Sequence, residues 1–160
     1  MAESLRLAIE KQICASLEAQ IPRLAGATFR GRIWFGDDDP LPMVSLVEAL
    51  NPDREPDSAG NQQVKKDRWI LLLQGWDAED VNNPTDSAHQ LMAEVKTALG
   101  VMRREHGDGL LSATPLAQVA DFIVEPGTVR PPGEISERAL FWLRLILELT
   151  EDDQKLYWPP

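Results

Sequence analysis

Residues 68–77 read RWILLLQGWD and include an uninterrupted apolar run, Trp69–Leu73. A short run of bulky apolar side chains that ends in a polar turn is typical of a buried strand. Because successive positions are apolar on both sides of the pleat, we expect a central strand that is covered on both faces. The run is much shorter than the ~18 residues of a membrane-spanning helix, so no membrane partner is expected.

Two helices are predicted, one before and one after this strand in the chain. The first covers Ser4–Leu17, where apolar residues recur at every fourth position and Ser4 is a suitable N-cap. The second begins at Asn82–Asp86, with Thr85 or Asp86 as its N-cap, and continues with apolar residues at helical spacing until a pair of glycines ends it. Each helix therefore has an apolar stripe with which to cover a sheet.

Four further segments have the β-branched, aromatic or alternating pattern of strands: 28–35, 43–50, 116–125 and 140–150. Between two of the predicted strands, residues 51–67 contain prolines and a glycine among polar residues and predict a long exposed loop. The order of elements predicts an α+β fold, with a mostly antiparallel or mixed sheet of four to five strands and two helices packed on one face.

The composition fits one domain, which we place at residues 1–150, followed by a C-terminal tail at residues 151–160. The chain has 160 residues, a formal net charge of −10, and one cysteine. A single cysteine excludes an intrachain disulfide, and strong acidity opposes binding to nucleic-acid phosphates. The first residues lack a basic segment followed by an apolar one, so we expect no secretory signal.

Catalytic motifs are scarce in the sequence. Neither a glycine-rich phosphate loop nor a zinc-protease motif is present, and we predict no cofactor. Asp37–Asp39 is a carboxylate triplet that fits either a solvated turn or a Mg²⁺ or Ca²⁺ site, and a small metal-dependent hydrolase remains an alternative interpretation. Ser87 and His89 are two positions apart on a predicted helix and do not face each other, which disfavours a catalytic triad. Cys14 lies beside the first apolar stripe and is expected to be a small buried side chain.

The five tryptophans give two kinds of expectation. Trp34, Trp69, Trp76 and Trp142 fall on predicted strands, where packing in the core is the usual explanation. Trp158 follows an acidic segment near the end of the chain, where it is expected to dock either on its own domain or on a neighbouring subunit.

Six short segments, taken in their order along the chain, resemble a known family. They are Asp38–Ser45, Gln74–Asp80, Asn83–Asp86, Leu91–Lys96, Arg130–Glu134 and Phe141–Leu143. Together they are similar to the tail terminator (tail completion) proteins of long-tailed bacteriophages, and the similarity covers roughly residues 5–150. None of these motifs is catalytic, and their specificity lies in their joint order.

The resemblance implies a virion protein located at the head-proximal end of the tail and assembled in the host cytoplasm. Such subunits form a ring, usually a hexamer, that caps the tail tube, stops polymerisation of the major tail tube protein and offers a surface to the head completion or connector protein. Genomic DNA would pass through the lumen without specific binding. One alternative is that the protein is a different virion component, a head-tail joining or neck protein. Another is that it is an adaptor protein with no role in the virion.

The resemblance supplies no catalytic residues, so the candidate site residues are those of subunit or tube contacts. The loop at 51–67 is expected to reach the tube or the connector, and the rigid segment that begins at Arg130 to contact the adjacent subunit. Arg30 and Arg32 share one face of a predicted strand and are expected to meet acidic residues of a neighbour. The full set of candidates is Arg30, Arg32, Asp37, Asp38, Asp39, Arg54, Lys65, Lys66, Arg130, Pro131 and Trp158.

Overall fold

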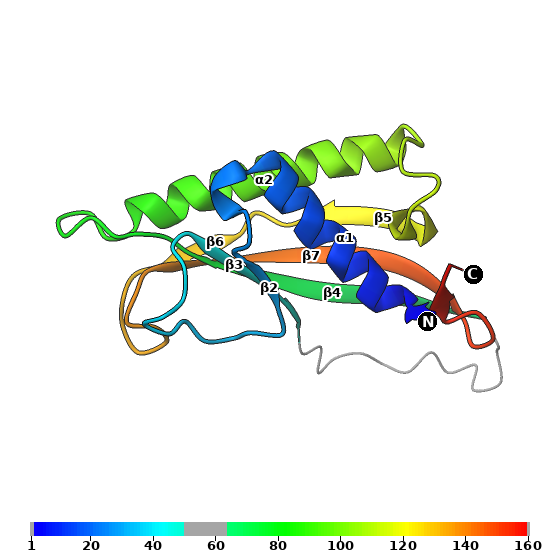
Figure 1. The fold of residues 1–160 in the computed structure, drawn as a ribbon, viewed down its shortest axis with the longest axis horizontal. Coiled ribbons are helices and arrows are strands. Elements are labelled where there is room, and N and C mark those ends of the chain that lie inside the picture. The colour runs from blue at the N-terminus through cyan, green and yellow to red at the C-terminus, as the bar shows by residue number, and fades with distance from the viewer. Residues whose placement is uncertain (1, 50–63, 160) are drawn as a thin grey trace.

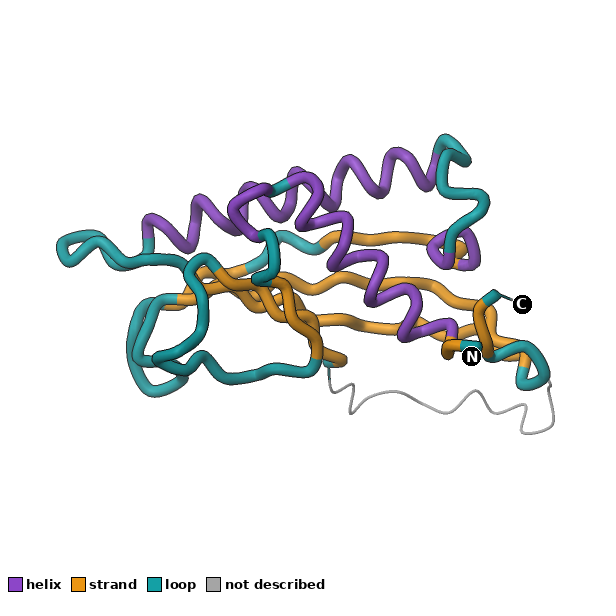
Figure 2. Tube along the Cα trace, in the orientation of Figure 1, coloured by secondary structure: helices purple, strands orange, loops and turns teal. Residues whose placement is uncertain are grey.

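The computed structural model describes residues 2–49 and 64–159. Its main element is a six-stranded mixed sheet in the order β2-β3-β4-β7-β5, with β6 paired to β7. Both long helices lie on one face of this sheet, which confirms the predicted α+β class (Figures 1 and 2). In chain order the elements are β1 (Glu3–Ser4), α1 (Leu5–Gln20), a 3-10 turn η1 (Pro22–Leu24), β2 (Thr28–Arg30), β3 (Met43–Glu48), β4 (Val64–Trp76), α2 (Asp86–Gly107), η2 (Pro115–Gln118), β5 (Val119–Val124), β6 (Thr128–Arg130), β7 (Leu140–Asp152) and β8 (Tyr157–Trp158).

The two longest strands, β4 and β7, form the centre of the sheet and pair antiparallel along all 13 residues of each. Alternate residues on the helix-facing side of β4, such as Trp69 and Leu71, are fully buried and belong to the main core. On the other side Ile70 and Leu72 are only half-buried. In the described residues the helices therefore cover one face of β4, and the prediction of cover on both faces was wrong.

The helices follow from local sequence signals together with the core that they cover. Ser4 caps α1, and its Oγ accepts a hydrogen bond of 3.3 Å from the backbone N–H of Leu7. Thr85 is the residue before α2, although its side chain makes no capping hydrogen bond. Neither helix in the described ranges combines the length and the apolar character that crossing a bilayer would take.

Two strand boundaries differ from the prediction. β2 stops at Arg30, because Gly31 adopts a positive φ of 71° that turns the chain out of the sheet. β4 begins at Val64, within the predicted loop, because β7 continues to Asp152 and offers backbone partners for the added residues. The rest of that loop, residues 51–63, lies outside the described residues.

The two ends of the chain pair with each other in a separate small sheet, β1 with β8. The backbone N–H of Leu5 donates to the carbonyl of Leu156 at 2.9 Å, and Trp158 packs against the main core. The boundary predicted at residue 150 falls inside β7, and the segment after it belongs to the same packed unit. Short strands such as β1, β6 and β8 have no recognisable sequence pattern.

Candidate subunit-interaction site

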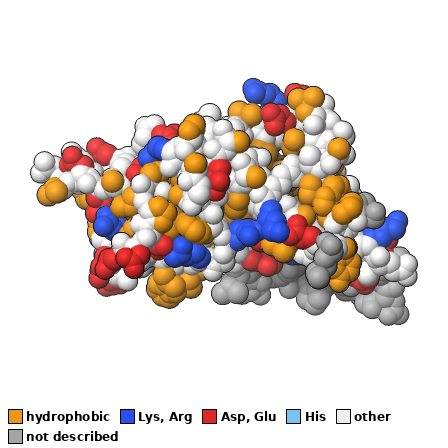
Figure 3. Space-filling model, in the orientation of Figure 1, with side chains coloured by type: hydrophobic (Ala, Val, Ile, Leu, Met, Phe, Trp, Pro, Cys, Tyr) orange, Lys and Arg blue, Asp and Glu red, His pale blue; other side chains and the backbone are white. Residues whose placement is uncertain are grey.

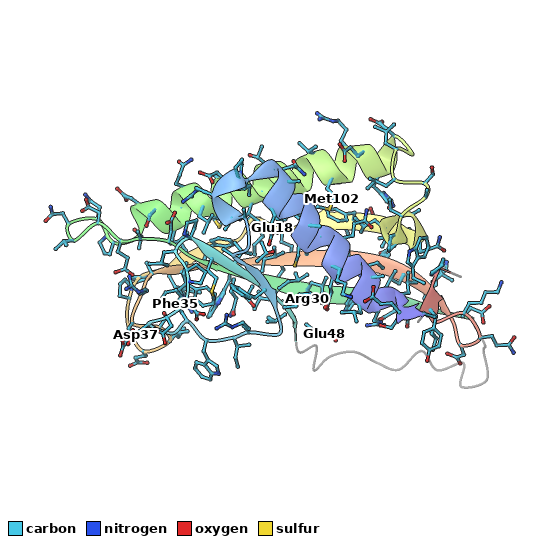
Figure 4. All side chains as sticks on the ribbon, viewed as in Figure 1. Glu18, Arg30, Phe35, Asp37, Glu48 and Met102 are labelled. Carbon is cyan, nitrogen blue, oxygen red and sulfur yellow. The ribbon has the colours of Figure 1, made fainter. Side chains whose placement is uncertain are left out.

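One end of the sheet carries two loops, residues 31–42 and 131–139, on the face that the helices leave open. They enclose a second apolar cluster, whose buried members are Met43, Trp76 and Leu140. Phe35 packs against this cluster, and its ring centroid lies 6.0 Å from that of Trp76. The two loops are therefore held by a small core of their own, which fixes their position at this end of the molecule (Figure 4).

Between the loops lies a cavity of about 210 Å³, which we call the loop cleft. Its walls mix apolar and polar side chains. They are Ile33, Trp34, Phe35, Trp76, Ile135 and Leu140, together with Asp37, Gln74, Ser136, Glu137 and Arg138. Trp34 is 73% exposed, so the prediction that it packs in the core was wrong. Ile33 and Ile135 are also exposed at the cleft. Figure 3 shows hydrophobic and acidic side chains close together at this end of the protein.

The polar side chains at the cleft are incompletely paired. Gln74 is only 8% exposed, and its Oε1 has no hydrogen-bond partner. By contrast, Trp76 Nε1 donates to Ser136 Oγ at 3.4 Å. A buried amide oxygen without a partner carries a desolvation cost that an incoming hydrogen-bond donor would remove. The cleft thus combines apolar and charged walls with one buried amide oxygen that lacks a partner.

Cationic side chains stiffen the loops around the cleft. The guanidinium of Arg138 lies 5.2 Å from the centre of the Phe35 ring, and that of Arg130 lies 5.2 Å from the centre of a Trp142 ring. Arg130 is thus engaged with its own sheet, while the adjacent Pro131 is exposed. These contacts hold the entry of the second loop in one conformation.

Arg32 pairs with Asp39 of its own chain, at 2.5 Å between Nη2 and Oδ1. The backbone N–H of Gly36 donates to the other oxygen of Asp39. This hydrogen bond has the larger effect, and together with the one from Arg32 it lowers the pKa of the Asp39 carboxyl. Arg30 lies elsewhere, since its charge acts on Glu10 of α1 and lowers the pKa of that carboxyl, against the larger effect of burial. The expected common face of Arg30 and Arg32 was wrong, because the strand ends between them at Gly31.

The acidic triplet is divided between two roles. Asp39 closes the turn just described, whereas Asp37 lines the loop cleft and Asp38 is exposed to solvent. No group of three His, Cys, Asp or Glu side chains in residues 2–49 and 64–159 is arranged to hold a metal ion. No contact in the described residues therefore favours the hydrolase alternative.

Two further candidate residues, Lys66 and Trp158, do not line the cleft. Lys66 is exposed on β4, opposite Thr150 of β7. Trp158 docks on its own domain, so the structure adopts one of the two arrangements expected for it. Arg54 and the side chain of Lys65 lie outside the described part of the chain.

Sequence reasoning missed the main residues of the cleft: Gln74, Trp34 and Ile135. The sequence around Trp34 did indicate a loop, because Gly31 and Gly36 flank the apolar triplet 33–35 and leave little room for a strand. No comparable signal marked Gln74, whose place at the cleft depends on both loops folding over β4.

No family model matches this chain, and no curated protein matches its sequence. The likeness to tail terminator proteins rests on the order of short motifs. Any functional assignment depends on those motifs and on the geometry of the cleft.

Proposed function

We propose that the protein is a structural subunit of a phage virion. It assembles into a ring on the end of the tail tube, and the family that it resembles implies a hexamer. The ring ends polymerisation of the tube protein and offers the surface that joins the head completion complex. The observation that supports this proposal is that three of the six family-like segments, 38–45, 74–80 and 141–143, contribute side chains to the second apolar cluster beside the loop cleft.

Several segments that are far apart in the sequence meet there. Gln74 and Trp76 come from the end of β4, within the family-like stretch 74–80. Leu41, from the stretch 38–45, packs on the cluster beneath the cleft. Ile135 directly follows the stretch 130–134 and lines the cleft. The shared location of Leu41, Gln74 and Trp76 supports the proposal that these stretches shape one contact surface.

The surface has the character of a protein contact. Exposed apolar side chains clustered beside a preformed hollow and bordered by charges are typical of protein–protein interaction sites. The aromatic walls match the residue types that contribute most to the binding energy of such sites. These features support a subunit or tube contact.

The charge of the chain is compatible with a DNA conduit. Each subunit carries a formal net charge of −10. A ring of such subunits would present a negative field to DNA, and repulsion of that kind prevents adhesion while leaving passage open. The account therefore needs no DNA-binding residues.

The proposal is tested by mixing gold-labelled protein with tail tubes assembled from the tube protein of the same virus. We expect label at one end of each tube and none along the sides. Label on isolated heads, with none on tubes, would instead indicate the head-tail joining alternative. Absence of label from both structures would refute a role at the head-tail junction.

A further inference from the structure

Three loops gather at one end of the molecule, which we call the loop end: residues 31–42, 77–85 and 131–139. Figure 1 shows the loop between β4 and α2, residues 77–85, projecting beyond the sheet at the left. A hydrogen bond from the backbone N–H of Ala139 to Glu79 Oε1 joins this loop to residues 131–139. The loop cleft lies between residues 131–139 and 31–42. The three loops therefore form one continuous surface.

Apolar side chains are exposed in each of the three loops. Val81 is 97% exposed and Trp34 is 73% exposed, while Ile33 and Ile135 are 52% exposed each. They make up half of the large apolar side chains that are exposed in residues 2–49 and 64–159. Exposed apolar side chains that gather in one region, in contrast to single scattered ones, indicate an interaction surface.

Hydrogen bonds within the loops hold this surface in place. Asp80 Oδ1 accepts from the backbone N–H groups of Asn82, at 2.7 Å, and Asn83, at 3.0 Å, which fixes the turn that carries Val81. The contacts of the other two loops, described above, act in the same way. Loops that are ordered before binding lose less conformational entropy when a partner docks on them.

The loop end is strongly acidic. Its three loops contain eight carboxylates and two cations, Arg32 and Arg138, so they carry a net charge of −6, more than half of the −10 of the whole chain. Arg32 pairs with Asp39 of the same loop. Even with the flanking Arg23 and Arg130 included, the surface stays negative. Its exposed carboxylates include those of Asp37, Asp38, Glu134 and Glu137.

The charge of the surface restricts the partner. Nucleic-acid phosphates and anionic lipid headgroups are repelled by it. A second copy of this chain is a poor match as well, because three hollows of the described residues each contain at least as many carboxylates as cations. These hollows are the loop cleft, a groove between α1 and α2, and a depression over β4, β5 and β7. The complementary partner is a different protein, with apolar hollows and a positively charged rim.

We propose that the loop end docks on the end of the tail tube, with Val81 and Trp34 in apolar hollows of the tube protein that are rimmed by lysine or arginine. This contact rests on the proposed function, because the tube protein is the partner that a capping role requires. It names the partner of the surface and the two side chains that contribute most to binding.

The test measures binding to tail tubes assembled from the tube protein of the same virus, by cosedimentation over a dilution series. Trp34→Ala should weaken binding by roughly 30-fold, as expected for an aromatic hot spot. Val81→Ser removes an apolar side chain without a change in charge and should weaken binding by roughly tenfold. Circular dichroism verifies that the variants are folded.

Matched controls come from exposed side chains outside the loop end. Tyr157→Ala removes an exposed aromatic ring of β8, and Leu110→Ser removes an exposed apolar side chain in the turn after α2. Each should change the dissociation constant by less than about twofold, since most surface contacts outside a hot spot are nearly neutral. Losses equal to those of Trp34→Ala and Val81→Ser would overturn the proposal.

Salt tests the charge of the partner separately. Binding of the unmodified protein should weaken by roughly fivefold between about 0.05 M and about 0.5 M salt, because screening removes the attraction to a positive rim. The double variant Asp38→Asn/Glu134→Gln should bind more weakly at low salt and respond less to added salt. Binding that is independent of salt, or an unchanged salt response of the double variant, would overturn the positive rim.

The outcomes separate this contact from the proposed function. If Trp34→Ala and Val81→Ser bind tube ends as well as the unmodified protein does, the contact is wrong and the function stands. If binding needs both side chains but gold label lies along the sides of the tubes, the contact stands and end-capping is wrong. If the unmodified protein binds no tubes, the function fails and the tube contact with it. Variants that lose binding only to the head completion protein would overturn the tube as the partner.

Discussion

Gly75 of β4 and Phe141 of β7 face each other so closely that a Cβ on Gly75 would overlap the Phe141 ring. Phe141 is fully buried in the main core and cannot move aside without displacing its neighbours. The pair therefore fixes the residue type at position 75 by packing, independently of any role in assembly.

The variant Gly75→Ala should lower the free energy of unfolding by about 1–3 kcal/mol, the usual cost of overpacking a core. Gly100→Ala is the control, since nothing lies within 4 Å of a Cβ at this position of α2. That change should raise stability by up to about 1 kcal/mol, because alanine favours a helix more than glycine does. Urea unfolding monitored by tryptophan fluorescence measures both; equal effects would contradict this packing argument.

Arg6 connects α1 to the two central strands. Its Nε lies 2.7 Å from Glu151 of β7, its Nη2 lies 2.5 Å from Asp67 of β4, and its guanidinium stacks 4.9 Å from a Trp69 ring centre. The Asp67 side chain is only 7% exposed, so these charge-assisted hydrogen bonds are poorly screened by water. The network therefore contributes more to stability than a surface ion pair does.

Replacement of Arg6 by Met keeps an apolar stem and should cost about 2 kcal/mol of unfolding free energy. Arg68→Met serves as the comparison, because Arg68 is 64% exposed and its Nε lies 3.9 Å from Glu148. It should cost under about 0.5 kcal/mol. Thermal and urea unfolding of the two variants would contradict this ranking if Arg68→Met were the more damaging change.

Cys14 should react slowly with thiol reagents in the folded protein. Burial raises the pKa of its thiol to about 11, against an ordinary value of 9.0. Because the folded-state pKa is the higher one, the associated stability is complete below pH 9.0 and is lost as the pH rises toward 11. Labelling at pH 8 should be much faster in urea than in buffer.

The matched variant for this prediction is Cys14→Ala. Its unfolding free energy should fall less between pH 9.0 and 11 than that of the unmodified protein, since other groups that titrate there are common to both. Parallel curves for the two proteins would show that the thiol makes no contribution.

Periodicity in the sequence predicted the elements that form the main core. Both helices and the paired strands β4 and β7 carry regular apolar patterns, and these patterns reflect burial against one another. Such a pattern depends on which face of an element is covered, so it is visible before any tertiary contact is known.

The candidate site was harder to predict, because tertiary contacts define it. The apolar residues 33–35 look like the continuation of β2, but the positive φ of Gly31 places them in a loop. The role of Gln74 depends on two loops that fold over its strand from distant parts of the chain. Trp158 could not be assigned to its own domain until the pairing of β8 with β1 was known.

The length distribution of tail tubes tests the central claim most directly. Tube protein of the same virus is allowed to polymerise with increasing amounts of this protein, and lengths are measured in negative-stain images. We predict that the mean length falls as the ratio of this protein to tube protein rises, and that capped tubes stop growing when fresh tube protein is added. Tubes of unchanged length that continue to grow at every ratio would contradict the account.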